Sequence, residues 1–144
     1  MVAEPGSELE RDLLDAMLEA GIPEPEMQYC PVPGRRFRVD FCWPRPDAKL
    51  VCEVEGGIYA KSGGRRCRLC GHVPTGSHGR PSGIIRDIAK GNACTLAGWR
   101  YIRVTGAMIA NGEAVDLVRS CLARPVAMPV RPLPVGWPQE VVDA

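Results

Sequence analysis

The segment LVCEVEGGIY, residues 50–59, constrains the fold most, because it combines a strand suited to a core with two acidic residues. Its apolar residues at positions 50–52 and 54 predict a strand. Successive side chains of a strand point to opposite faces, so Glu53 and Glu55 share one face. Two carboxylates on a partly buried face are costly unless something positive compensates them. The sequence therefore predicts a compensating positive charge beside this strand.

The composition predicts one globular domain. The chain has 144 residues, of which 45% are hydrophobic and 24% are charged, and this suits a single compact core. No apolar run approaches the ~20 residues of a membrane span, and the acidic beginning is unlike a signal peptide. We therefore expect no membrane partner and a cytoplasmic location, in a bacterial or phage-infected cell. The seven cysteines are odd in number, so we expect reduced thiols, some of them binding metal.

Charge is distributed unevenly along the chain. Residues 1–26 contain eight acidic residues and one basic residue, whereas residues 56–112 contain nine basic residues and one acidic residue. A concentrated basic segment is typical of a protein that binds a phosphate backbone, and a solvated basic surface explains it equally well. The residues expected to contact nucleic acid are Arg65, Arg66, Arg68, Arg80 and Arg86.

Hydrophobic periodicity predicts the element order α-β-β-β-α-β-α, an α/β fold with helices against a mixed sheet. The expected helices span residues 7–21, 83–98 and 112–122, and the expected strands begin at residues 27, 37, 50 and 99. The strand at 37–43 alternates, with apolar residues at 37, 39, 41 and 43 on one face. The turn PRPDAK then predicts a hairpin with the strand at 50. Asp40, Glu53 and Glu55 would converge on the polar side of that hairpin.

Two segments fall outside this pattern. Residues 60–82 are rich in glycine, arginine and cysteine and predict a long basic loop inserted in a domain of residues 1–124. Residues 125–144 contain many prolines and predict an extended tail.

Five motifs in chain order resemble the PD-(D/E)XK nuclease superfamily, and more narrowly its very-short-patch-repair-endonuclease-like and small phage endonuclease branch. They are SELE at 7–10, RVDFCWP at 38–44, EVEGG at 53–57, Ser77-His78 with Asp87, Lys90 and Asn92, and GWR at 98–100. The resemblance covers residues 7–122. It implies a restriction-endonuclease-like αβββαβ core and a metal-dependent DNA endonuclease that acts on branched or mismatched DNA in recombination or repair. The site residues that follow from it are Asp40, Glu53, Glu55, His78, Lys90 and Glu10.

The chemistry of phosphodiester hydrolysis accounts for the acidic strand. A divalent cation polarises the phosphate and helps to make hydroxide from water. Mg²⁺ prefers oxygen ligands and usually takes one or two carboxylates. We therefore expect Asp40 and Glu53 to bind Mg²⁺ or Mn²⁺, with the cation as the compensating charge. Alternatively, both residues are salt-bridge partners of Arg38 or Arg103.

Other site residues also have alternatives. Glu10 either ligates the metal or its water, or closes a capping box with Ser7. Glu55 stands where the superfamily usually has a lysine, so Lys90 or His78 would have to supply that cation, or Glu55 would hold a second metal. Asp87 and Lys90 either turn towards the site or form an i,i+3 ion pair on a helix.

The predicted loop contains a second motif, CRLCGHVPTGSH at residues 67–78. Cys67-x-x-Cys70 has the shape of a zinc knuckle, which needs two further ligands for a tetrahedral Zn²⁺ site. His72 and His78 are nearest in sequence, and Cys30 and Cys42 are alternatives. The motif is otherwise a pair of reduced cysteines in a loop.

Two functions other than cleavage fit the same sequence. One is a catalytically inactive nucleic-acid-binding protein on the same scaffold, and the other is a zinc-stabilised protein-interaction module. Since cutting both strands of a duplex usually takes two active sites, a homodimer is expected for the nuclease.

Overall fold

The computed structural model describes residues 4–56 and 81–124. Within them the elements are α1 (Glu8–Glu19), β1 (Glu26–Tyr29), β2 (Val39–Trp43), β3 (Leu50–Glu55), α2 (Pro81–Leu96), β4 (Arg100–Thr105), α3 (Gly106–Asn111) and α4 (Glu113–Ala123). The strands form one sheet in the order β1-β2-β3-β4. β2 pairs antiparallel with β1 and β3, whereas β3 and β4 are parallel. The predicted α/β class with a mixed sheet and a β2–β3 hairpin is confirmed.

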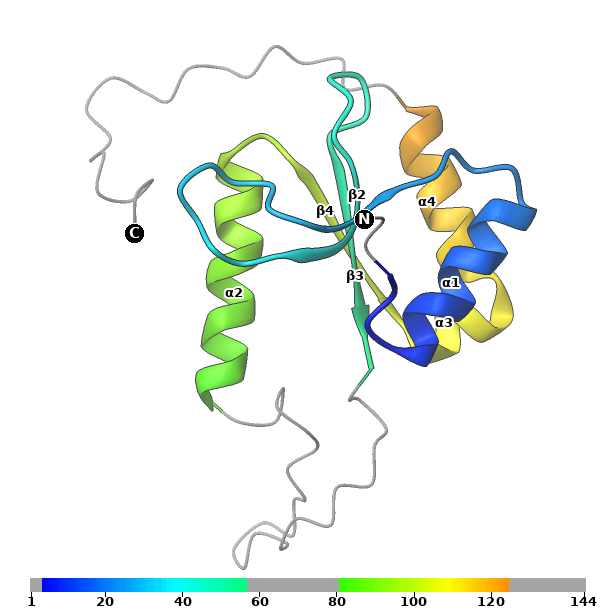
Figure 1. Cartoon of the computed structure of the whole chain (residues 1–144), viewed down its shortest axis with the longest axis horizontal. Helices are drawn as coiled ribbons and strands as arrows, with labels where there is room; N and C mark the ends of the chain where they lie inside the picture. Colours follow the sequence, from blue (N-terminus) through cyan, green and yellow to red (C-terminus); the bar gives the residue numbers. More distant parts are fainter. Residues whose placement is uncertain (1–3, 57–80, 125–144) are drawn as a thin grey trace, which may run out of the picture.

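The helices cover the sheet on both faces. Figure 1 shows α2 on one side of the sheet and α1, α3 and α4 on the other. The larger apolar cluster lies under α1, α3 and α4, with Leu13, Phe41, Leu50 and Val104 fully buried. A smaller cluster on the α2 side contains Val39, Cys42, Val51, Cys94 and Trp99. Successive residues of β3 face opposite sides of the sheet. Val51 packs on the α2 side, so Glu53 and Glu55, which follow it at intervals of two, also face α2.

The sequence did not predict α3 as a separate helix. Thr105 ends β4 and caps α3, because its Oγ1 accepts a hydrogen bond from the Met108 backbone N–H at 3.3 Å. Gly112 then ends α3 with φ of 87°, a left-handed conformation that glycine adopts without steric penalty. The helix predicted at residue 112 is therefore the second of two, α4.

The apolar pattern differs from the prediction in β2, and in α2 it does not mark the buried face. β2 begins at Val39, and both Phe37 and Val39 pack on the α2 side of the sheet, away from Phe41 and Trp43. In α2, the isoleucines at positions 84, 85 and 88 are 47%, 65% and 56% exposed, whereas Cys94 is fully buried. Apolar periodicity located α2 in the sequence but did not identify the side that packs against the sheet.

The GWR motif anchors the start of β4. The Trp99 indole Nε1 donates to the Pro31 carbonyl at 2.9 Å. The Arg100 guanidinium donates to the Ala48 carbonyl at 3.1 Å and to the Arg124 carbonyl at 2.8 Å. These bonds tie β4 to the β2–β3 turn and to the end of α4, so the motif fixes the strand beside β3. Across the described ranges, none of the helices has the length and apolar character needed to cross a bilayer.

Candidate active site

Asp40 and Glu53 lie on neighbouring strands on the face covered by α2. The antiparallel register pairs Phe41 with Cys52, so the next positions along the two strands are Asp40 and Glu53. The Asp40 Oδ2 accepts a hydrogen bond from the Val54 backbone N–H at 2.8 Å. This bond fixes one carboxylate of the pair beside β3, as the hairpin prediction required.

Lys90 of α2 reaches this pair from across the sheet face. Its Nζ forms an ion pair with the Glu53 Oε1, and the two side chains are only 20% and 10% exposed. The same ammonium lies 6.0 Å from the centroid of the Phe37 ring. Lys90 therefore faces the carboxylates, and the partner of Glu53 is neither Arg38 nor Arg103.

One lysine does not fully compensate the two carboxylates. The pKa of Glu53 is raised from 4.5 to about 8, first because the side chain is buried and then because the Asp40 charge lies close to it. The hydrogen bond and charge of Lys90 act in the opposite direction. Burial and the neighbouring carboxylate thus shift Glu53 towards its protonated form near neutral pH, and Lys90 does not fully offset them.

Glu55, two residues further along β3, is compensated differently. The Arg103 Nε donates to the Glu55 Oε1 at 2.7 Å, and Arg103 Nη2 forms an ion pair with the same oxygen. Arg103 Nη2 also lies 3.9 Å from the Asp87 Oδ2. β3 and β4 are parallel, and Arg103 pairs in register with Glu53. Its guanidinium therefore extends two positions further along the sheet to reach Glu55. The sequence marked Arg103 as basic but gave no sign of this partner.

Glu10 lies in the capping box of α1. Its Oε1 accepts from the Ser7 Oγ at 3.0 Å, and its Oε2 accepts from the Gly6 backbone N–H at 2.8 Å. The Ser7 Oγ in turn accepts from the Glu10 backbone N–H at 3.2 Å. These are the contacts of the capping alternative, in which both carboxylate oxygens are used locally.

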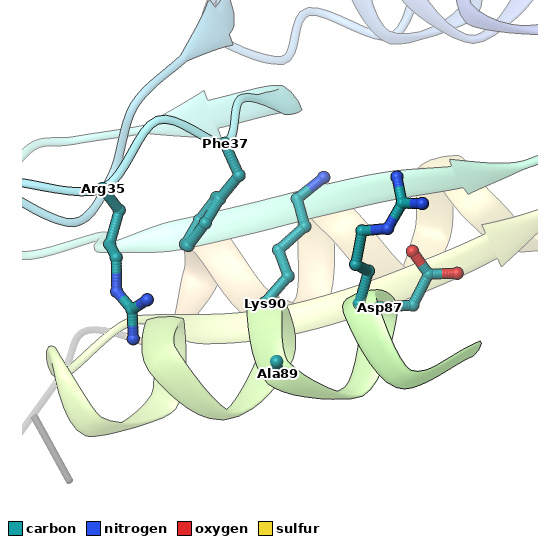
Figure 2. A pocket seen from close by; sticks show the side chains of 6 residues that line it. Arg35, Phe37, Asp87, Ala89 and Lys90 are labelled. Carbon is teal, nitrogen blue, oxygen red and sulfur yellow. The ribbon is translucent and has the colours of Figure 1, made fainter. Parts of the chain in front are cut away.

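A pocket lies beside the Asp40–Glu53 pair, between α2 and the segment that precedes β2. Its volume is about 350 Å³, and the lining residues are Arg35, Phe37, Arg86, Asp87, Ala89 and Lys90. Figure 2 shows Arg35 and Phe37 extending towards α2, while Lys90 extends from α2 towards them. Arg86 was expected to contact nucleic acid. Arg35 lies before the predicted strand and Phe37 was predicted on its apolar face, so neither was expected at the site.

Several predicted site residues lie outside the described residues. They are Arg65, Arg66, Cys67, Arg68, Cys70, His72, His78 and Arg80, together with the tail at 125–144. The end of the predicted loop, residues 81 and 82, belongs to α2.

Of the two remote zinc-ligand alternatives, Cys30 is exposed. Cys42 is buried, and burial and then Glu26 raise its pKa to about 12, which disfavours the thiolate that zinc requires.

The donor set of the site suits a hard cation. Asp40 and Glu53 offer carboxylate oxygens, and Mg²⁺ usually binds one or two carboxylates and keeps several waters. Within residues 4–56 and 81–124, no group of three or more His, Cys, Asp or Glu side chains is arranged to hold a metal. A cation here would therefore be held by the two carboxylates, with water or substrate oxygens completing its coordination.

Comparison with protein-family models, with curated proteins and with solved structures gives no match to this chain.

Proposed function

We propose that the protein is a metal-dependent DNA endonuclease with a restriction-endonuclease-like core. The observation that carries the proposal is the cluster of Asp40, Glu53 and Lys90, which brings two carboxylates and one ammonium from three separate elements onto one sheet face. Such a cluster is expensive to bury for structural reasons alone, because one of its carboxylates is driven towards protonation. A bound cation would offset that cost.

Asp40 and Glu53 would hold Mg²⁺ or Mn²⁺. When bound, such a cation polarises the phosphodiester and lowers the pKa of a coordinated water. Asp40 is held for this role by the Val54 backbone N–H. Glu53 would have to release its proton and share its carboxylate between the cation and Lys90.

Lys90 would provide the positive charge that the superfamily usually places two residues after the glutamate. Here that position holds Glu55, which is paired with Arg103. The Lys90 ammonium lies against Glu53 and is partly shielded from water. From there it could orient the attacking hydroxide or stabilise the charge that develops on the phosphate.

DNA is the proposed substrate because basic side chains line the pocket next to the cluster. Arg86 and Arg35 line the pocket next to Lys90, and further arginines follow Glu55 in the sequence at residues 65–68 and 80. Cations of this density attract a phosphate backbone and release its counterions. The expectation that the DNA is branched or mismatched rests on the sequence resemblance.

A cleavage assay with defined DNAs tests the proposal. Purified protein is incubated with Mg²⁺ or Mn²⁺ and with labelled linear, nicked, flapped and four-way DNAs, and parallel reactions contain a chelator. We expect cation-dependent cuts that the Asp40→Asn and Glu53→Gln variants no longer make. Arg119→Gln is the matched control, because Arg119 pairs with Asp116 on α4 at 3.0 Å, on the opposite side of the sheet.

The outcomes of this assay separate the candidate functions. Cleavage by the Asp40→Asn, Glu53→Gln double variant at the wild-type rate would remove these residues from the site. Binding of DNA without any cleavage by the wild-type protein would favour the inactive nucleic-acid-binding scaffold.

A further inference from the structure

The pocket beside Lys90 combines an aromatic ring with an excess of positive charge. Its lining includes the ring of Phe37 and three cationic side chains, Arg35, Arg86 and Lys90, against the single carboxylate of Asp87. Lys90 is already paired with Glu53. The two arginines therefore give the pocket a positive potential beyond what the Asp40–Glu53 pair requires.

Arg35, which lines the pocket, has an N–H group that is not used in a hydrogen bond among the described residues. Its Nε is buried and, among the described residues, has no hydrogen-bond partner. A buried donor without a partner costs free energy that a bound acceptor would recover. A phosphate oxygen is such an acceptor, and a guanidinium binds phosphate through two parallel N–H groups.

Phe37 is held in place while it lines the pocket. It packs against the buried cluster that contains Val39, Val51 and Trp99, so the ring does not have to be ordered when a ligand binds. The cavity of about 350 Å³ is near the lower end of the ~300–1,000 Å³ found for ligand pockets. That volume accommodates one nucleotide, and it is too small for a base-paired duplex.

We propose that this pocket takes one unpaired DNA base, stacked on Phe37, with its flanking phosphates bound by Arg35 and Arg86. The inference rests on the proposed nuclease function and specifies its substrate as DNA with an unpaired or unstacked nucleotide near the cut. Lys90 links the two sites, because it lies at once against Glu53 and 6.0 Å from the Phe37 ring centroid. An unpaired base in the pocket would place the adjacent phosphate beside the two carboxylates.

The test measures binding without cleavage, by fluorescence anisotropy in the presence of a chelator. The probes are a labelled single strand of about 12 thymidines and a blunt duplex of the same length, within the ~4–16 nucleotides that small single-strand-binding folds cover. We expect the wild-type protein to bind the single strand more tightly than the duplex. Phe37→Leu, which keeps an apolar side chain but removes the ring, should bind the single strand at least about fivefold more weakly and bind the duplex unchanged.

Arg35→Gln and Arg86→Gln should also weaken single-strand binding more than the control Arg119→Gln, which removes the same charge from α4. Equal effects of all three arginine variants, or unchanged single-strand binding by Phe37→Leu, would overturn the pocket assignment. Selective loss in the Phe37 and Arg35 variants supports it even if the wild-type protein never cuts DNA. Cleavage of duplex DNA that is unaffected by Phe37→Leu would leave the nuclease function standing and remove the pocket from it.

Discussion

Glu53 and Glu55 are two residues apart on one strand and face the same helix, but their surroundings differ. Glu55 is paired with an arginine, because the Arg103 guanidinium contacts its Oε1 through both Nε and Nη2. Glu53 shares its surroundings with a second carboxylate, Asp40, and with one ammonium, Lys90. Glu55 is thus bound by a guanidinium through two N–H groups, whereas Glu53 shares one ammonium with the nearby carboxylate of Asp40 and has a raised pKa.

This difference is why we propose a cation at Glu53 and not at Glu55. Arginine can satisfy a carboxylate through a planar fork that stays charged at any relevant pH. At Glu53, burial first and the nearby Asp40 charge second raise the pKa, and the Lys90 ammonium does not offset them. Two glutamates on the same face of one strand therefore differ in the side chains that compensate their charge.

The largest expected effect is on cleavage. Glu53→Gln should lower the rate at least about a thousandfold, which corresponds to ~4 kcal/mol of transition-state stabilisation. Glu55→Gln should lower it less than about tenfold, because Glu55 is paired with Arg103. Initial rates on one labelled DNA substrate measure both. Equal losses in the two variants would show that Glu55 also belongs to the reacting site, for example as a ligand of a second metal.

The pH dependence of stability should distinguish the two glutamates next. The folded protein holds a proton on Glu53 up to a pKa of about 8, whereas the unfolded chain releases it near 4.5. The associated stability is therefore fully present below pH 4.5 and is lost as the pH rises through about 8. For the cation-free protein, the part of this loss that falls between pH 5 and pH 8 amounts to roughly 3 to 4 kcal/mol in the free energy of unfolding.

Denaturant titrations between about pH 5 and pH 8, in the presence of a chelator, measure this loss. Glu53→Gln should remove most of the decline attributable to this site, and Glu55→Gln should leave it in place. A decline of the same size in wild type and Glu53→Gln would mean that Glu53 is not the titrating group.

Lys90 should matter more for rate than for folding. Lys90→Met removes the ammonium from Glu53 and should slow cleavage about a hundredfold, within the range for a positioned catalytic side chain. The fold should tolerate the change, because Glu53 can remain protonated when its partner is lost. Lys90→Arg should recover part of the rate. A large fall in melting temperature without a specific loss of cleavage would instead make the Lys90–Glu53 ion pair a structural one.

Cation binding should stabilise the protein by a smaller amount. At a Mn²⁺ concentration about ten times the dissociation constant, mass action gives ~1.4 kcal/mol. The melting temperature of wild type and of Glu55→Gln should therefore rise with Mn²⁺, and that of Asp40→Asn, Glu53→Gln should not. A Mn²⁺ response that persists in this double variant would place the cation elsewhere.

The smallest effect is expected for Glu10, the third glutamate considered for the site. Glu10→Ala removes two hydrogen bonds of the α1 capping box and should lower stability by about 1 kcal/mol. Cleavage per folded molecule should stay at the wild-type level, as measured beside the neighbouring control Glu8→Ala. A cleavage loss comparable with that of Asp40→Asn would restore Glu10 as a metal or water ligand.

Local patterns predicted much of this fold. Strand alternation placed Glu53 and Glu55 on one face, and the PRPDAK turn predicted the hairpin that brings Asp40 beside Glu53. The boundary of α3 was missed, because a six-residue helix is too short for apolar periodicity to reveal. Phe37 and Val39 were assigned to the wrong face, because strict alternation was extended to the first residue of β2 and beyond it.

The sequence by itself determined the mixed α/β order, the acidic strand and its need for a compensating positive charge. It could not assign the partner of each glutamate, because the partners are distant in the chain. Lys90 lies 37 positions after Glu53, and Arg103 lies 48 positions after Glu55. The packing of α2 over the sheet brings Lys90 into contact with Glu53, and the parallel pairing of β3 with β4 brings Arg103 into contact with Glu55. Side-chain type and spacing fix the local backbone, whereas charge compensation depends on distances of a few ångströms that only the tertiary structure sets.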